Sequence, residues 1–227
     1  MRRKIGNWVA GLAAIVAAGL VPVPGHADTY FFTSDHCTGG CGTAPFAKAD
    51  ILDLGGGTLD FTITLLSATK IVDTGFPVSF AFNLSGGPTI TYSNLTAGFN
   101  IPNVIPVNQQ AAGAGFTTNS GNDAYHFDGT GYFMYGVLWG GGNGGGAGYT
   151  GTLHFDVTAA GLTLASIIQN AAGNFMALDV LGATGNTGPV DASVPVPGPI
   201  VGAGLPGLIL ACGGLLALAR RRRQAIA

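Results

Sequence analysis

The sequence predicts an all-β protein: an antiparallel β-sandwich or jelly-roll-like ectodomain, with an N-terminal signal helix and a single C-terminal transmembrane helix. Gly, Thr, Asn and Asp are abundant and Glu is absent, a composition that disfavours helices and favours strands and turns. Residues 59–65 alternate between apolar and polar side chains, as a strand with one packed face does. Two uncharged stretches near the chain ends account for the expected terminal helices.

Residues 1–27 have the three parts of a secretory signal peptide. Arg2, Arg3 and Lys4 precede an uncharged apolar stretch at 8–23, and small residues lead to a candidate cleavage point between Ala27 and Asp28. The stretch is shorter than the roughly 20 residues that a permanent span needs. We therefore expect export through the Sec translocon and cleavage by signal peptidase, with an uncleaved anchor as the alternative.

Residues 28–182 are predicted to form the β-sandwich ectodomain. A hairpin is expected from residues 51–54 and 59–65, because three glycines at 55–57 separate the two strand-like runs. A helix is expected over residues 160–170. Further strands are expected at 76–83, 89–92, 124–127, 132–139, 149–157 and 174–181. Many short strands at regular spacing favour a sandwich or jelly roll, and residues 183–196 have the composition of a Gly/Pro linker.

Residues 200–219 are the predicted transmembrane helix. This uncharged stretch matches a hydrocarbon thickness of roughly 30 Å at about 1.5 Å per helical residue. Four arginines follow it directly and are expected to stay in the cytoplasm by the positive-inside rule: Arg220, Arg221, Arg222 and Arg223. The sequence therefore predicts a single-pass intermediate in the inner membrane with the ectodomain outside, and the alternative is a buried core helix.

The C-terminal segment 197–227 and the residue before it resemble a known sorting signal. A proline motif, a single span and an arginine cluster occur in that order, and together they resemble the PEP-CTERM signal in an alphaproteobacterial Val-Pro-Gly-Pro variant. The motif residues are Val196, Pro197, Gly198 and Pro199. Gly198 stands where the family has Glu. The resemblance implies recognition by an exosortase-type membrane sorting protease, removal of the tail, and delivery to the cell surface or extracellular matrix of a Gram-negative bacterium.

The charge of the ectodomain excludes one class of partner. All eleven acidic residues of the chain are Asp and lie between residues 28 and 199, where Lys48 and Lys70 are the only basic residues. With neutral histidines the segment carries a net charge of −9. Nucleic-acid binding needs a cationic face, so we expect none.

Cys37 and Cys41 flank two glycines, and the natural interpretation in an oxidising compartment is a small disulfide loop. On the chain-entropy estimate such a loop stabilises the fold by roughly 2 kcal/mol. Two free thiols, or a metal site with Asp35 and His36, are the alternatives.

The tripeptide His-Phe-Asp occurs twice, at 126–128 and at 154–156. On a strand, each copy places His and Asp on one face and Phe in the core. If the two strands are neighbours, four side chains could hold a metal ion: His126, Asp128, His154 and Asp156. The favoured interpretation is a polar sheet face over a Phe core, so no metal and no cofactor are expected.

The sequence contains no nucleophile elbow, zinc-protease helix or paired Glu. We therefore expect a non-enzymatic surface or matrix protein associated with exopolysaccharide. The alternatives are a carbohydrate-binding module of the matrix, a permanently anchored single-pass membrane protein, and a metal-dependent enzyme that uses the two tripeptides.

Overall fold

The computed structural model of the chain describes residues 26–74, 76, 78–101, 125–141 and 148–197, which belong to one compact unit, Gly25–Ile200. These residues form antiparallel sheets, so the all-β prediction is confirmed. The prediction of a helix over 160–170 is wrong, because that segment contains only a short 3-10 helix, η3 (Leu164–Ser166). Gly161, the second residue of the segment, has a positive φ of 73°, and the few apolar residues that follow do not continue a helical period.

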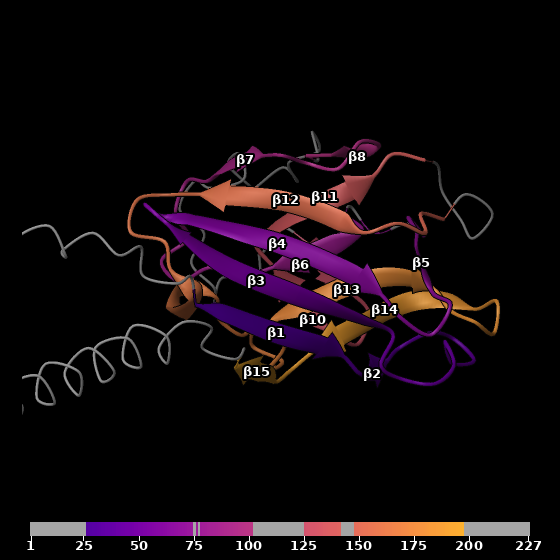
Figure 1. Cartoon of the computed structure of the whole chain (residues 1–227). Coiled ribbons are helices and arrows are strands. Elements are labelled where there is room, and N and C mark those ends of the chain that lie inside the picture. Colours follow the sequence, from indigo (N-terminus) through magenta and orange to yellow (C-terminus); the bar gives the residue numbers. More distant parts are fainter. Residues whose placement is uncertain (1–25, 75, 77, 102–124, 142–147, 198–227) are drawn as a thin grey trace, which may run out of the picture. The chain divides into compact units, whose positions relative to one another are not determined.

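The first sheet has six strands, and all its pairings are antiparallel (Figure 1). In spatial order they are β15 (Pro195–Pro197), β1 (Ala27–Phe32), β3 (Ala47–Gly55), β4 (Thr58–Leu65), β12 (Leu153–Thr158) and β7 (Thr91–Ser93). The predicted hairpin is the β3–β4 pair. Its two turn residues, Gly56 and Gly57, have φ of 64° and 81°, a conformation that glycine adopts without steric cost.

The second sheet lies against the first (Figure 1). In spatial order its strands are β2 (Ser34–Asp35), β14 (Thr187–Ala192), β13 (Met176–Leu181), β6 (Phe80–Phe82), β11 (Tyr135–Trp139) and β8 (Phe99–Asn100), and β5 (Lys70–Ile71) also pairs with β13. A separate two-stranded sheet consists of β9 (Tyr125–Phe127) and β10 (Gly131–Phe133).

Aromatic rings from both larger sheets form the core between them. Phe61 on β4 stacks on Phe155 of β12 at 4.9 Å between ring centroids, and it also contacts Phe82 of β6 at 4.9 Å. All three side chains are fully buried. Burial of each ring stabilises the fold by roughly 1.5–3 kcal/mol. The two sheets therefore share one apolar interior, which is consistent with a β-sandwich.

The segment 183–196 is not a linker, which corrects the sequence prediction. β14 pairs with β13 along its whole length and is almost entirely buried, and β15 adds a further strand at the edge of the first sheet. The Gly and Pro content of the segment suggested a linker because Pro cannot donate a hydrogen bond to a ladder. Here Pro189 contributes its carbonyl, which accepts a hydrogen bond from the His36 backbone N–H at 3.1 Å. The folded domain thus continues to Pro197.

The predicted signal helix and the predicted span at 200–219 lie outside the described residues. Gly198, Pro199 and the cluster Arg220, Arg221, Arg222 and Arg223 lie outside them as well. Within the part of the chain that the structure describes, no helix has the length and apolar character needed to cross a membrane.

Candidate functional site

Three ionisable side chains meet on the outer face of the first sheet. Asp60 lies on β4, and His154 and Asp156 lie on β12. The register of the β4–β12 pair places Asp156 opposite Asp60 and His154 opposite Thr62. Because side chains alternate across a strand, these residues face away from the core that contains Phe61 and Phe155. We call Asp60, His154 and Asp156 the Asp–His–Asp cluster.

The cluster is compact. The His154 Nε2 atom lies 2.7 Å from Oδ2 of Asp60 and 3.9 Å from Oδ1 of Asp156. One ligand-type atom from each residue lies within 4.8 Å of those of the other two. The Thr62 hydroxyl donates to Oδ1 of Asp60 at 3.2 Å. Both carboxylates therefore present one oxygen to the same imidazole nitrogen.

Asn94, directly after β7, holds the other side of the cluster. Its side-chain amide donates to Oδ2 of Asp156 at 2.6 Å, and its carbonyl oxygen lies 3.2 Å from Nδ1 of His154. Asn94 has a φ of 53°, in the left-handed region that Asn tolerates better than most residues. Thr96 adds to this connection, because its backbone N–H donates to the His154 carbonyl at 2.9 Å. The turn after β7 thus orients both residues of β12.

These contacts determine which ring nitrogens of His154 carry a proton. A carbonyl only accepts hydrogen bonds, so the Asn94 carbonyl requires a proton on Nδ1. Nε2 then faces two carboxylates and needs a proton or another cation. The pKa of His154 is raised above its usual value, chiefly by the hydrogen bond to Asp60, while burial acts in the opposite direction.

Asp156 is the most buried member of the cluster. Its side chain is 10% exposed, against 38% for His154 and 23% for Asp60. Among the described residues its Oδ1 atom has no hydrogen-bond partner and no solvent contact. A buried carboxylate oxygen without a partner is costly, so this position favours a further cation.

The second tripeptide is not part of the cluster. His126 and Asp128 belong to β9 and the turn after it, and β9 pairs with β10, whereas β12 pairs with β4 and β7. The structure therefore does not assemble the four-residue metal site that required the two strands to be neighbours. The His126 ring instead packs against the ring of Tyr132 at 4.5 Å between centroids, and its Nδ1 lies 3.7 Å from Asp128.

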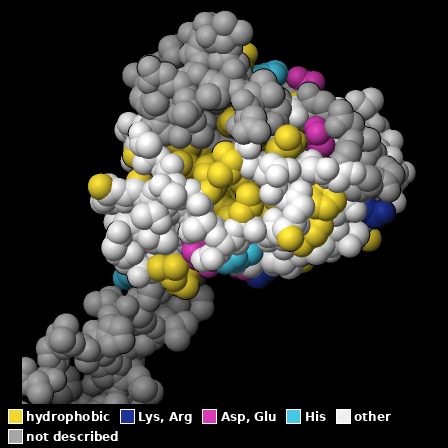
Figure 2. Space-filling model, turned by 90° about the horizontal axis from the view of Figure 1, so that it is seen from above, with side chains coloured by type: hydrophobic (Ala, Val, Ile, Leu, Met, Phe, Trp, Pro, Cys, Tyr) yellow, Lys and Arg dark blue, Asp and Glu magenta, His cyan; other side chains and the backbone are white. Residues whose placement is uncertain are grey.

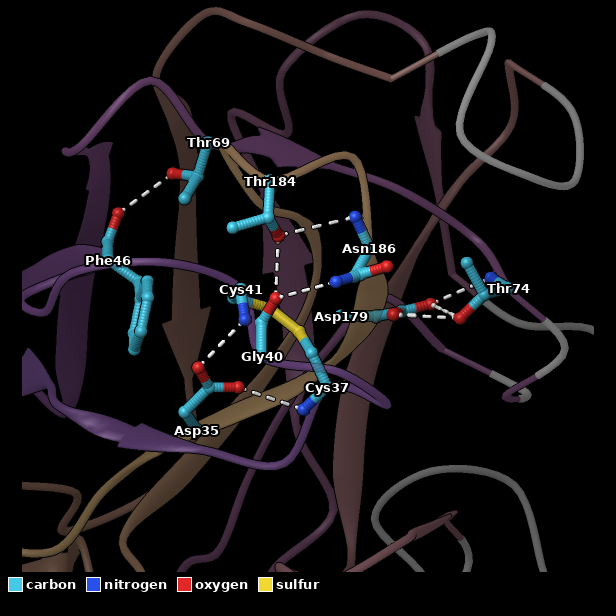
Figure 3. Close-up of a disulfide and its surroundings, with 10 residues drawn as sticks. All are labelled: Asp35, Cys37, Gly40, Cys41, Phe46, Thr69, Thr74, Asp179, Thr184 and Asn186. Carbon is cyan, nitrogen blue, oxygen red and sulfur yellow. Dashed lines mark hydrogen bonds between the residues drawn. A yellow bond between two sulfur atoms is a disulfide. The ribbon is translucent and has the colours of Figure 1, made fainter.

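Cys37 and Cys41 form a disulfide, with their Cα atoms 5.4 Å apart (Figure 3). Asp35 accepts hydrogen bonds from both cysteine backbone N–H groups, at 2.9 Å and 2.7 Å. The Gly40 carbonyl accepts one from the Thr184 hydroxyl at 2.6 Å. The loop is thus attached to the turn between β13 and β14. Both oxygens of Asp35 serve backbone donors, which favours a structural role over the alternative metal site.

The described residues of the two processing signals lie side by side. Ala27 and Asp28, which flank the predicted signal cleavage point, begin β1, and Val196 and Pro197 of the sorting motif end β15. In the antiparallel β1–β15 pair, Asp28 lies opposite Pro197.

Sequence reasoning found His154 and Asp156 but missed Asp60 and Asn94. The alternation of residues 59–65 placed Asp60 on the outer face of its strand, but nothing local showed that β12 pairs with β4. Asn94 has no sequence signal, because its role depends on a left-handed turn that follows a three-residue strand.

No family model, curated protein or solved structure matches this chain. The fold and the site define an acidic, disulfide-containing, all-β domain with a compact Asp–His–Asp cluster on one sheet face. The face shown in Figure 2 has few Lys and Arg side chains. The arrangement can hold a proton or a cation.

Proposed function

We propose that this chain is an exported cell-surface or matrix protein. Its β-sandwich domain is carried between a cleaved secretory signal and a PEP-CTERM-like sorting tail. The domain itself is non-enzymatic and is associated with exopolysaccharide.

One observation of the structure carries the proposal: the buried core lies between the two predicted processing signals, which overlap the folded domain only at Ala27 and at Val196 and Pro197 of the edge strand β15. β1 begins at Ala27, and β15 ends at Pro197. Cleavage between Ala27 and Asp28 leaves five of the six residues of β1, including the buried Tyr30 and Phe32, within the domain. The signal-peptide cut therefore leaves the core intact, and recognition of the sorting motif involves only the end of the edge strand β15.

The disulfide and the charge support export. A Cys37–Cys41 disulfide persists in oxidising compartments and is rare in the cytosol. The net charge of −9 between residues 28 and 199 favours solubility outside the cell and disfavours nucleic acid. The partners in this proposal are the Sec translocon, signal peptidase and an exosortase-type protease, with the membrane engaged through residues 200–219 before the tail is removed.

The test is mass spectrometry of the mature protein from a Gram-negative host that has its own exosortase. We expect an N-terminus at Asp28 and loss of the segment that contains Arg220–Arg223. A host that lacks the protease should retain the full tail in its membrane fraction. An intact C-terminus in surface material from the complete host contradicts the sorting proposal and supports a permanently anchored protein.

Carbohydrate binding is the second candidate, and Tyr132 is the observation that favours it. This side chain on β10 is 44% exposed and packs beside His126, so one ring face is available to stack on a sugar. Loss of matrix-polysaccharide binding in Tyr132→Ala, with binding kept in Tyr132→Phe, would support it. A wild-type chain that binds no matrix polysaccharide contradicts it.

A further inference from the structure

We infer that Asp60, His154 and Asp156 form a binding site for one divalent transition-metal ion, with Zn²⁺ as the best fit. The inference goes beyond the proposed function, because neither export nor sorting requires a metal. It stands on the geometry of the cluster, on one unpartnered buried oxygen, and on the pairing with Asp50 of Lys48, the one Lys on the described strands of this sheet.

Each of the three residues has one atom held from behind and one atom facing the centre. Nδ1 of His154 is held by the Asn94 carbonyl, Oδ2 of Asp156 by the Asn94 amide, and Oδ1 of Asp60 by the Thr62 hydroxyl. The atoms that remain are Nε2 of His154, Oδ2 of Asp60 and Oδ1 of Asp156. Protein metal sites have such outer partners, which orient each ligand toward the ion.

The distances suit a small ion. Zn–N and Zn–O bonds are about 2.0–2.2 Å long, so the ligand atoms of a tetrahedral site lie roughly 3.3–3.5 Å apart. The two separations from Nε2 of His154, 2.7 Å and 3.9 Å, bracket that range. Modest side-chain rotations would equalise them around an ion. One imidazole and two carboxylates favour Zn²⁺ over Ca²⁺ or Mg²⁺, which take oxygen ligands.

The unpartnered oxygen of Asp156 is a second observation that favours a cation at this position. Oδ1 is buried and faces Nε2 of His154, and no described residue donates a hydrogen bond to it. A proton on Nε2 already serves Asp60 at 2.7 Å, whereas a metal ion would contact both carboxylates at once. The partial exposure of His154 and Asp60 gives such an ion a route from solvent.

No basic side chain on the described strands of this sheet offsets the two carboxylates. Lys48 is the only basic residue on those strands, and its Nζ atom is bonded to Asp50 at 2.6 Å. Lys70 lies on β5, which pairs with β13 in the other sheet. Bound Zn²⁺ with neutral His154 would balance both carboxylates, and the fourth ligand position would be open to water or another oxygen donor.

Two similar groups in the described residues lack at least one of these features. Asp35 lies close to Cys37 and Cys41, but the cysteines form a disulfide and both Asp35 oxygens accept backbone hydrogen bonds. His36 lies 2.8 Å from Asp191, whose Oδ1 atom is also buried without a hydrogen-bond partner, but no third ligand-type side chain joins that pair among the described residues. The Asp–His–Asp cluster is therefore the group that we assign.

The test is calorimetric titration of the full chain with ZnCl₂. The chain is expressed without a histidine tag, purified in detergent, and stripped with EDTA. We expect one ion per wild-type chain and binding weakened at least about tenfold in Asp156→Asn and His154→Gln, since loss of outer-shell partners alone costs about 10- to 100-fold. The second tripeptide supplies matched controls: His126→Gln and Asp128→Asn should bind like wild type.

Asp60→Asn is the ligand variant that we expect to fold most readily, because Asp60 is partly exposed and Asn has the same shape as Asp. It keeps the test decisive if another variant fails to fold. Circular dichroism in EDTA checks that each variant is folded, and Co²⁺ provides a second measurement through its visible absorption. We expect a tetrahedral Co²⁺ spectrum that His154→Gln abolishes. The assignment is overturned if wild type binds no Zn²⁺, if folded Asp60→Asn and Asp156→Asn bind normally, or if the control variants weaken binding equally.

Discussion

The tripeptide His-Phe-Asp occurs on two strands of this protein, β9 and β12, and the two copies differ in their surroundings. In both copies Phe is fully buried, at Phe127 and Phe155, and His faces solvent. The aspartates differ: the side chain of Asp128 is 81% exposed, whereas that of Asp156 is 10% exposed. Strand alternation therefore fixes the direction of each side chain but not its chemical environment.

The difference comes from the position of each strand in its sheet. β12 lies between β4 and β7, so Asp60 and Asn94 reach its His and Asp from both sides. Among the described residues β9 pairs only with β10, and Tyr132 lies opposite His126. The His and Asp of the β12 copy thus belong to a polar cluster with residues of both neighbouring strands. The His and Asp of the β9 copy lie at a strand end that is exposed to solvent.

Truncation of the two phenylalanines should give the largest effects. Phe155 contacts the rings of Phe61, Phe80 and Phe82 in the main core, and Phe127 packs in a smaller cluster with Phe76. We expect Phe155→Ala to lower the unfolding free energy by about 4 kcal/mol and Phe127→Ala by about 3 kcal/mol. Urea unfolding followed by circular dichroism measures both. A larger loss of unfolding free energy in Phe127→Ala than in Phe155→Ala would contradict the assignment of Phe155 to the main core.

A third carboxyl sharpens the comparison, because Asp179 on β13 is fully buried but faces Thr74 in place of a histidine. Burial raises its pKa to about 7, and the hydrogen bonds from Thr74 lower it in part. The folded state then binds a proton that the unfolded state has released, so stability falls as pH rises from about 4 to about 7. Asp179→Asn should remove on the order of 3 kcal/mol of this dependence.

Unfolding free energies of wild type and Asp179→Asn across that pH range provide the measurement. Other carboxylates titrate in both proteins, so the difference between the two curves isolates Asp179. Parallel curves would show that burial does not raise the pKa of Asp179 above its value in the unfolded state.

Asn94 is one of the two residues that make the surroundings of β12 different from those of β9. Asn94→Ala should lower the unfolding free energy by about 2 kcal/mol in EDTA. It loses the hydrogen bond to Asp156 and places alanine at a φ of 53°. Asn94→Gly removes the side chain without the backbone strain, so its loss should be about 1 kcal/mol. Thermal and urea unfolding distinguish the two, and equal losses would assign the whole effect to the side chain.

Much of the fold could be predicted from the sequence, because alternation and glycine turns are local signals. The β3–β4 hairpin and the strands that contain Phe80, Phe127, Phe155 and Leu178 are present where the pattern indicated. β14 was missed since Gly188 and Pro189 resemble a linker, and its strand conformation depends on pairing with β13. The helix predicted over 160–170 failed because a short partly apolar run does not specify its own period.

The candidate site was predictable only in part, for a related reason. The sequence correctly placed His154 and Asp156 on a solvent-facing side of a strand above a buried Phe. It could not supply Asp60, which is 94 residues away from His154, because strand pairing is a property of the whole sheet. The terminal signals stay predictions, since they depend on segments outside the described residues.

The smallest effect is expected at the β9 copy of the tripeptide. His126→Gln and Asp128→Asn should each change the unfolding free energy by less than about 0.5 kcal/mol, because the side chains are 47% and 81% exposed. His126 contacts Tyr132, but that ring is itself 44% exposed, so the contact excludes little water. Urea unfolding in EDTA measures the change. A loss above about 1.5 kcal/mol would show that β9 contacts a further partner besides β10. Both tripeptides would then have partners on both sides, and they would differ only in which residues those partners supply.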